Sequence, residues 1–178
     1  MKLASILLLI AGVGASAQEK KDAEKLAPYY PTPPSIVEKM LQIASLKSGE
    51  KMFDLGSGDG RIVLMAATKF KADATGVELD PSLVRQSSEE IRRTGNDQRA
   101  RIILGDILKQ DYSSADVVTA YLLPKAMELV RPVLEKQLKK GARVVAHDFE
   151  MQGWKPEKVE TIEDDGEGRS HTVFLYRR

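Results

Sequence analysis

The chain has 178 residues, of which 42% are hydrophobic and none is cysteine, and its 27 basic and 26 acidic side chains give a formal charge of +1. The lack of cysteine excludes disulfide scaffolds, cysteine-ligated zinc sites and a cysteine nucleophile. The balanced charge gives no electrostatic case for nucleic-acid binding, and the length fits one domain with one hydrophobic core.

The first 17 residues are typical of an export signal. Lys2 supplies a positive charge, residues 3–13 form an almost unbroken apolar run, and the Ala-Ser-Ala triplet at 15–17 fits a small-x-small cleavage site. The run is shorter than the roughly 20 residues that cross a bilayer. We therefore expect residues 1–17 to be a signal peptide and the protein to be exported (periplasmic or secreted). A membrane anchor formed by an uncleaved N-terminus is the alternative.

Residues 18–34 precede the first predicted helix. The first eight of them are mostly charged, and the last seven include four prolines, which exclude a helix interior and favour an extended path over a folded surface. From Ser35 apolar residues recur at helical spacing until Gly49. We therefore expect residues 18–34 to form a linker and a proline-rich lead segment, and residues 35–178 to form one domain.

Beyond Gly49, short β-branched runs alternate with amphipathic stretches. The predicted helices cover residues 61–70, 81–94 and 124–139. The predicted strands cover residues 51–55, 72–79, 101–104, 116–123, 142–148, 158–162 and 172–176. This alternation predicts a parallel sheet covered on both faces. The chain after residue 148 is too short for a full helical crossover, and residues 164–168 have the composition of a hairpin turn, so the sheet should end in an antiparallel pair.

The strongest local signal lies between the first strand and the helix that follows it. Residues 54–60 read Asp-Leu-Gly-Ser-Gly-Asp-Gly, and the glycines allow positive φ angles and a close approach of backbone to a ligand. The G-x-G-x-G spacing departs from the dinucleotide pattern G-x-G-x-x-G, and the carboxylates of Asp54 and Asp59 would repel a pyrophosphate. They suit a ligand that carries an ammonium and a sulfonium group. A tight turn without a ligand is the alternative.

A further carboxylate, Glu78, lies at the end of the second strand, in the sequence Gly-Val-Glu-Leu-Asp. In nucleoside-binding sheets an acid at this place accepts hydrogen bonds from a ribose diol. The alternative is a solvated charge at a strand end. The loop and the acid occur in the order that favours a nucleoside ligand.

These residues resemble the class I S-adenosylmethionine-dependent methyltransferases. Residues 54–60 are similar to the glycine motif of that family, residues 77–80 to its ribose-binding acid, and residues 105–107 to its adenine-binding motif. The resemblance implies an α/β fold: a single Rossmann-like sheet of seven strands, mostly parallel with strand 7 antiparallel between strands 5 and 6, and helices on both faces. It implies S-adenosyl-L-methionine as the cofactor.

A narrower resemblance extends over nearly the whole chain after the signal. Residues 30–33, 54–63, 77–81, 116–124 and 141–149 are similar to the small family that includes the mitochondrial lysine methyltransferases of the adenine nucleotide translocase and the ATP synthase c subunit. This similarity implies methyl transfer to a protein lysine, with the lead segment folded over the cofactor. Together the two resemblances imply that the cofactor contacts Tyr30, Thr32, Asp54, Gly56, Ser57, Gly58, Gly60, Glu78, Asp106 and Ile107. The export signal departs from those relatives, which carry a membrane-targeting segment.

Three residues at the expected ligand edge are candidates for catalysis: Tyr121, His147 and Asp148. A lysine amine must lose a proton before it attacks, and an acceptor or a water near these side chains could take that proton. Tyr121 could instead line a lysine channel, and His147 and Asp148 could be ordinary strand-end residues. The Asn-Pro-Pro-Tyr element of enzymes that methylate planar nitrogens is absent, which argues against adenine and glutamine amides as acceptors.

The second histidine, His171, is expected to be a plain strand residue, and the sequence indicates no metal site. We expect a protein lysine or a small-molecule amine as acceptor, no nucleic-acid partner, proximity to a membrane only through the substrate, and a monomer. Two alternatives to a protein-lysine methyltransferase remain: a small-molecule methyltransferase, and an exported module that binds a nucleoside-like ligand without turnover.

Overall fold

Strands and helices alternate through most of the described part of the chain. The computed structural model describes residues 30–178, so the predicted signal peptide and the predicted linker up to residue 29 lie outside the described residues. The helices are α1 (Pro34–Ile43), α2 (Arg61–Lys69), α3 (Pro81–Arg93), the short 3-10 helix η1 (Ile107–Lys109) and α4 (Pro124–Gln137). The strands are β1 (Lys51–Leu55), β2 (Asp73–Glu78), β3 (Ala100–Leu104), β4 (Val117–Ala120), β5 (Arg143–His147), β6 (Lys158–Ile162) and β7 (His171–Arg177).

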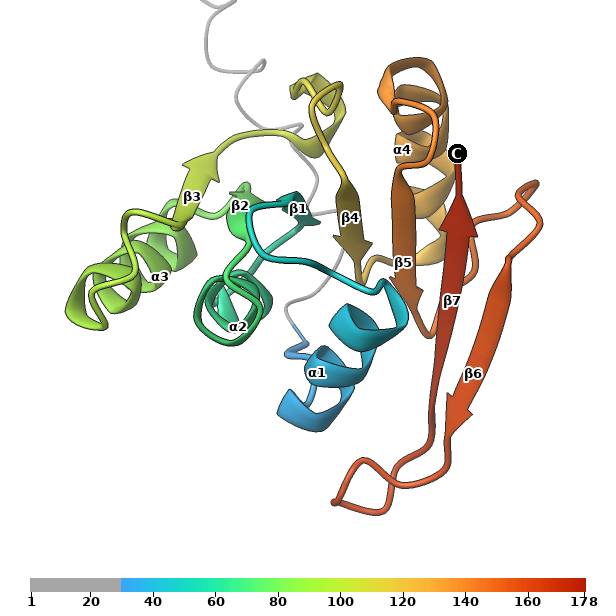
Figure 1. Ribbon diagram of the computed structural model, residues 1–178, viewed down its shortest axis with the longest axis horizontal. Helices are drawn as coiled ribbons and strands as arrows, with labels where there is room; N and C mark the ends of the chain where they lie inside the picture. Colours follow the sequence, from blue (N-terminus) through green and yellow to red (C-terminus); the bar gives the residue numbers. More distant parts are fainter. Residues whose placement is uncertain (1–29) are drawn as a thin grey trace, which may run out of the picture.

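The seven strands form one sheet in the order β3-β2-β1-β4-β5-β7-β6 (Figure 1). Strands β1 to β5 run parallel, whereas β7 is antiparallel to both of its neighbours, β5 and β6. This order confirms the expected sheet. The carboxyl ends of β1, β2, β4 and β5 therefore meet the amino end of β7 at one edge, the edge at which open α/β sheets bind ligands.

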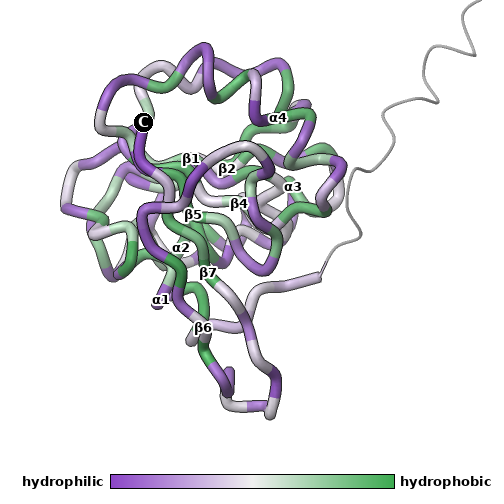
Figure 2. The backbone as a smooth tube through the Cα atoms, turned by 90° about the vertical axis from the view of Figure 1, so that its right-hand side faces the viewer, coloured by the Kyte–Doolittle hydropathy of each residue, from purple (hydrophilic) through white to green (hydrophobic). Residues whose placement is uncertain are grey.

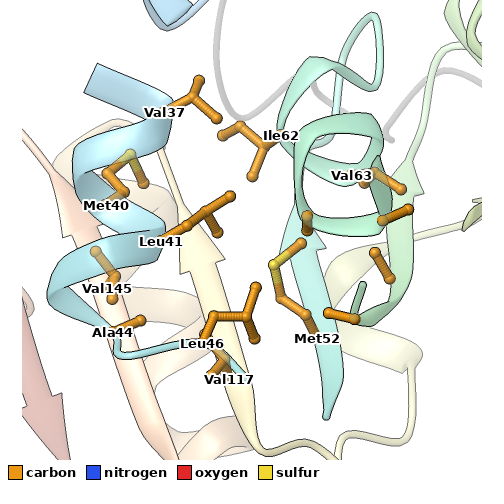
Figure 3. Packing of buried hydrophobic residues seen from close by; sticks show 14 of the residues in the cluster. Val37, Met40, Leu41, Ala44, Leu46, Met52, Ile62, Val63, Val117 and Val145 are labelled. Carbon is orange, nitrogen blue, oxygen red and sulfur yellow. The ribbon is translucent and has the colours of Figure 1, made fainter. Parts of the chain in front are cut away.

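Successive residues of a strand point to opposite sides of the sheet. Both faces therefore carry apolar side chains, and helices cover both. On one face, Met40 and Leu41 of α1 pack with Met52 of β1 and Val145 of β5, and α2 closes the same cluster (Figure 3). On the other face, Val144 belongs to a second cluster that α4 covers. Two separate apolar clusters thus hold the strands in register and leave the ligand edge open.

The hairpin of β6 and β7 projects from the rest of the sheet (Figure 2). Its turn contacts the beginning of the described chain: Arg169 donates to the Tyr30 hydroxyl at 2.7 Å, and the Ser35 hydroxyl donates to the carbonyl oxygen of Asp165 at 2.8 Å. The lead segment is therefore held beside a hairpin that lies more than 100 residues away in sequence.

Five of the seven strands differ from their predicted bounds, and apart from the end of β4 each difference is a single residue. Strand β4 ends at Ala120 rather than at residue 123, because its pairing with β1 and β5 stops there, and Pro124 then opens α4. Strand β7 begins at His171, which pairs with Ile162 of β6. Within residues 30–178, no helix has the length and apolar character needed to cross a bilayer.

Candidate active site

A cavity opens at the carboxyl ends of β1, β2 and β4. Most of the residues predicted for the site line it: Tyr30, Thr32, Asp54, Gly56, Ser57, Gly58, Glu78, Asp106, Ile107 and Tyr121. Of the described residues predicted for the site, Gly60, His147 and Asp148 lie outside the cavity wall. The structure therefore brings together residues spread over more than 90 positions of the sequence.

The glycine loop is folded onto β2 by its own backbone. The amide groups of Gly56 and Ser57 both donate to the carbonyl oxygen of Val77, at 2.9 and 3.0 Å. Gly56 and Gly58 have positive φ angles, 71° and 54°, and a Cβ atom added to Gly56 would lie 3.0 Å from the Leu122 side chain. The glycines are needed because the loop turns sharply and approaches its neighbours closely.

Gly60 has a packing role instead of a cavity-lining one. It is the residue before α2, with φ at 77°, and a Cβ there would lie 3.1 Å from Ser87 and 3.4 Å from Ile102. The third glycine of the motif thus lets α2 begin close to α3 and β3. Gly60 was predicted to contact the cofactor, but it does not line the cavity.

The Ser57 hydroxyl is buried and has no hydrogen-bond partner among residues 30–178. It lines the cavity, where a bound ligand could satisfy it. Gly76 of β2 makes this position accessible, since a side chain on Gly76 would collide with Ser57. Sequence analysis did not select Gly76, because only the register of β1 against β2 brings it under the loop.

Backbone groups orient the Glu78 carboxylate. Its Oε2 accepts from the Gly58 amide at 2.8 Å, and its Oε1 accepts from the amides of Leu79 and Asp80, each at 2.8 Å. Glu78 is therefore a fixed acid between the glycine loop and the turn after β2, and not a freely solvated charge. Oε2, with one donor, retains lone-pair capacity for a ligand hydroxyl.

Asp54 is a buried carboxyl at the base of the cavity. Only 2% of its surface is exposed, and its Oδ1 accepts from the Thr119 hydroxyl at 2.7 Å. Burial, opposed by the Thr119 bond and aided by the charges of Glu78 and Asp59, raises the pKa of Asp54 to about 7. A cationic ligand would favour the ionised form of this carboxyl.

The far end of the cavity is built by η1. Asp106 caps this short helix, since its Oδ1 accepts from the Leu108 amide at 2.8 Å, and Ile107 is buried against the cavity. The Tyr112 hydroxyl donates to the Ile107 carbonyl at 2.7 Å and so fixes the turn. An acid beside an apolar side chain suits a planar base with an amino group.

The lead segment covers the opposite side. Thr32 is 3% exposed, and its carbonyl accepts from the Arg61 guanidinium at 3.0 Å. The Thr32 hydroxyl lies 3.2 Å from His147 Nδ1. The lead segment is therefore attached both to α2, below the glycine loop, and to the end of β5.

The three predicted catalytic residues contact one another behind the cavity. The Tyr121 ring lies over the His147 ring at a centroid distance of 3.9 Å, and its hydroxyl donates to Asp148 Oδ2 at 3.3 Å. Burial and the Asp148 carboxylate raise the pKa of Tyr121 to about 12. Burial, opposed by Asp148 and aided by His171, lowers the pKa of His147 to about 4. At neutral pH Tyr121 is therefore a protonated wall residue and His147 is uncharged.

Two further residues belong to this group. His171 Nδ1 lies 2.9 Å from both His147 Nε2 and Asp148 Oδ2, and His171 Nε2 lies 3.3 Å from Asp165 Oδ2. His171 is thus no plain strand residue. Sequence analysis missed it and Asp165 because they join the site only through the antiparallel pairing of β7 with β5.

Comparison with known proteins identifies the family. Residues 54–158, more than half of the chain, match the family described as the ANTKMT methyltransferase domain. A protein-lysine N-methyltransferase from Saccharolobus islandicus (strain REY15A) is 43% identical over 150 residues, which are 84% of this chain and 92% of that relative. The chain belongs to the ANTKMT methyltransferase family.

A further sequence relative and a solved structure extend the comparison. The lysine N-methyltransferase of the ATP synthase c subunit from Homo sapiens is 34% identical over 149 residues, which are 84% of this chain but 60% of the human enzyme. The crystal structure of an RNA methyltransferase from Salinibacter ruber, in complex with S-adenosyl-L-homocysteine, has a TM-score of 0.76 at 38% identity and covers 83% of this chain and 93% of that one. The chain is accordingly an S-adenosylmethionine-dependent methyltransferase.

The cavity fits this cofactor. Ser57 offers a hydroxyl that is unpaired within the described residues, Gly56 leaves space beside Leu122, and Asp54 is a carboxyl whose ionised form a sulfonium would stabilise. Glu78 would hold the ribose diol, and Asp106 with Ile107 would hold the adenine. These assignments to single groups of the cofactor are the ones that the resemblance to class I methyltransferases implies.

Proposed function

We propose that the chain transfers the methyl group of S-adenosylmethionine to the side-chain amine of a protein lysine. The observation that carries this proposal is the 43% identity to a protein-lysine N-methyltransferase over 92% of that relative's length. The geometry supports it, because the rings of Tyr30 and Tyr121 line the same cavity as the glycine loop. Aromatic walls suit the long aliphatic stem and the cationic head of a lysine.

Bound S-adenosylmethionine supplies a methyl group on a sulfonium, which an amine can displace in line. The contribution of the chain is to position the amine and to remove water from it. A lysine has an ordinary pKa of about 10.4, and desolvation beside a cationic cofactor lowers it toward the neutral form that attacks. The Tyr121 hydroxyl stays protonated at neutral pH and so cannot take the proton of the lysine. Its ring instead positions the acceptor, while Asp148 accepts a hydrogen bond from the Tyr121 hydroxyl.

The test is methyl transfer from labelled S-adenosylmethionine to fractionated cell-envelope proteins, soluble proteins, RNA and low-mass amines. We expect the label in protein, on lysine residues identified by mass spectrometry of tryptic peptides. Gly56→Leu, in which the new side chain fills the cavity, serves as the inactive control. Label confined to RNA or to low-mass products would reject the protein-lysine proposal. Cofactor binding without any labelled product would favour a binding module.

We propose in addition that residues 1–17 direct export, which would place the acceptor outside the cytoplasm. The support is the charge, apolar run and Ala-Ser-Ala site of that segment. Fusing residues 1–25 to a reporter that is active only after export tests this. An inactive reporter removes the export proposal, and a full-length species that stays with the membrane supports an uncleaved anchor.

The finer partner proposals are a monomer and a substrate that brings the enzyme near a membrane. The support for the second is that relatives act on the ATP synthase c subunit, according to their names. Light scattering coupled to gel filtration measures the mass of the particle, and a dimer mass would overturn the first proposal. Labelled acceptors found only in the soluble fraction would overturn the second.

A further inference from the structure

Three nitrogen and oxygen atoms converge behind Tyr121. His147 Nε2 and His171 Nδ1 are 2.9 Å apart, His171 Nδ1 and Asp148 Oδ2 are 2.9 Å apart, and His147 Nε2 and Asp148 Oδ2 are 3.4 Å apart. Three ligand atoms that each lie about 2.1 Å from one ion are separated by about 3.0 to 3.4 Å in octahedral or tetrahedral geometry. The triangle therefore has the size of one face of a metal coordination sphere.

The outer nitrogen of each histidine has a partner as well. His147 Nδ1 lies 3.2 Å from the Thr32 hydroxyl, and His171 Nε2 lies 3.3 Å from Asp165 Oδ2. Histidines that bind metals place their second ring nitrogen against an oxygen in this way, which fixes the tautomer and the ring orientation. The side chain of Asp165 is itself fully buried and held by Arg169 at 3.0 Å.

Asp165 is held on the outer side of His171. Its Oδ1 accepts from the amides of Glu167 and Arg169, at 2.8 and 3.2 Å, and its Oδ2 accepts from the Arg169 guanidinium at 3.0 Å. On the inner side, His171 Nδ1 lies 2.9 Å from the Asp148 carboxylate. The His171 ring is therefore fixed with Nδ1 facing the triangle.

The backbone prepares Asp148 for this place. Asp148 has a positive φ angle of 58°, which is rare for a residue other than glycine and marks a locally strained position. Its Oδ1 accepts from the Thr172 amide at 2.9 Å, so that Oδ2 is aimed at the histidines. His147 is fully buried and His171 is 5% exposed, which keeps water from separating the three ligands.

We propose that His147, Asp148 and His171 bind one divalent first-row transition-metal ion, with zinc as the preferred ion. Two imidazoles and one carboxylate form the donor set that such ions take in proteins, whereas magnesium and calcium prefer oxygen donors alone. The ion ties the end of β5 to the start of β7. It also acts on the active site from behind, because Tyr121 is bound to the same Asp148 oxygen and Thr32 to His147. No redox step is involved.

The test is metal binding by the untagged full chain. Protein stripped with EDTA is incubated with zinc chloride, desalted and analysed by mass spectrometry for zinc. We expect one zinc per chain, a higher melting temperature with zinc than with EDTA, and visible absorption bands when cobalt(II) replaces zinc. These readouts are independent of methyl transfer, so failure of the lysine proposal leaves them unchanged.

Three aspartate variants provide graded controls. Asp148→Asn keeps an acceptor for the Thr172 amide but loses the metal-binding charge, so stoichiometric zinc should be lost. Asp165→Asn removes the negative charge that faces His171 Nε2 and Arg169, and should weaken binding by about 10- to 100-fold. Asp164→Asn changes the same charge in the same hairpin but outside the triangle, and should bind zinc like the wild type.

Two results would overturn the proposal. The first is wild-type protein that retains no zinc and shows no cobalt spectrum, which would mean that hydrogen bonds alone join the three side chains. The second is equal zinc content in the wild type and in Asp148→Asn. The first result is measured on the wild-type protein alone. The proposal can therefore be rejected even if Asp148→Asn fails to fold.

Discussion

The two halves of the ligand edge are built differently. The half at β1, β2 and β3 consists of short consecutive segments, a glycine loop and an acid that are held mainly by backbone amides, as Gly58 holds Glu78 at 2.8 Å. The half at β4, β5 and β7 consists of side chains bound to other side chains, such as Tyr121 to Asp148 and His147 to His171. We assign the first, the cofactor half, to S-adenosylmethionine, and we propose that the second, the acceptor half, receives the lysine.

This difference has a physical consequence. A site held by the local backbone tolerates changes in distant side chains, whereas a site held by side-chain contacts across strands depends on each partner. Substitutions in the first half should therefore change cofactor affinity, and substitutions in the second should change turnover with little change in cofactor affinity. Variants of single residues in each half can separate the two roles.

The largest effect is expected from Gly56→Leu. Gly56 has a φ angle of 71° and faces Leu122, so a side chain there strains the loop and fills the cavity. We expect the Kd for S-adenosylmethionine to rise more than about a hundredfold, or about 2.8 kcal/mol, in calorimetry. Gly95→Leu is the matched control, since Gly95 has a φ of 67° and a Cβ atom added there would meet no atom within 4 Å. Equal affinities in both variants would reject the assigned cofactor site.

The next effect is expected from Glu78→Ala. The substitution removes an acceptor for a ribose diol and also frees the amides of Gly58, Leu79 and Asp80. Loss of a hydrogen bond to a charged acceptor costs about 1.5 to 3 kcal/mol, so the Kd should rise about ten- to hundredfold. Calorimetry with Glu89→Ala, an acid on α3 that lies outside the cavity wall, gives the control. An unchanged Kd in Glu78→Ala would show that the carboxylate only folds the loop.

A substitution in the other half should act on turnover. Tyr121→Ala removes the wall at the acceptor end, and misplacing the acceptor should lower kcat about tenfold or more. The Kd for S-adenosylmethionine should change by less than about threefold, which corresponds to less than one hydrogen bond. Tyr121→Phe keeps the ring and loses only the bond to Asp148, so its kcat should lie between that of the wild type and that of Tyr121→Ala. An equal loss of cofactor affinity in Tyr121→Ala would contradict the division into two halves.

The smallest effect is a dependence of cofactor affinity on pH. The pKa of Asp54 in the free protein is about 7, and a bound sulfonium favours its ionised form. Binding should therefore release a proton below pH 7, and affinity should fall as the pH falls, by at most about tenfold per pH unit. Above pH 7 Asp54 is already ionised, so it should no longer make the affinity for S-adenosylmethionine depend on pH. Calorimetry in two buffers of different ionisation enthalpy measures the released proton.

Asp54→Asn should remove this dependence, whereas Asp97→Asn, a change at an exposed acid, should keep it. The stability of the free protein provides a second reading. Because the folded-state pKa of Asp54 is raised, its contribution to stability is present at low pH and is lost as the pH rises toward 7. Asp54→Asn should therefore have the higher melting temperature at pH 8. A pH-dependent affinity in Asp54→Asn would assign the proton to another group.

The sequence predicted which residues of the cofactor half lie together, because its signals are local. The run from Asp54 to Gly60 lies directly after one strand, and Glu78 lies at the end of the next, so parallel pairing alone brings them to one edge. Gly60 is the exception. Its positive φ angle serves the start of α2, and the sequence pattern does not distinguish a glycine needed for packing from one that approaches a ligand.

The acceptor half was predicted only in part. His147 is the last residue of β5, Asp148 follows it and Tyr121 follows β4, so all three were identifiable as edge residues. No local sequence pattern marked His171 and Asp165 as site residues. They belong to the hairpin of β6 and β7, and the spacing of its apolar residues does not predict where this hairpin joins the sheet. Their distances to His147 and Asp148 depend on the register of β7 against β5, where Val173 lies opposite His147.

By itself, the sequence determined the alternation of strands and helices, the glycine loop and the acid at the end of β2, since these follow from spacing along the chain. Tertiary structure decided which side chains complete the acceptor half, because a shift of one residue in β7 would turn His171 to the opposite face. It likewise decided that Gly76 must be small, through the contact of β2 with the loop. Spacing sets the elements of this methyltransferase, and strand order and register assemble its second half.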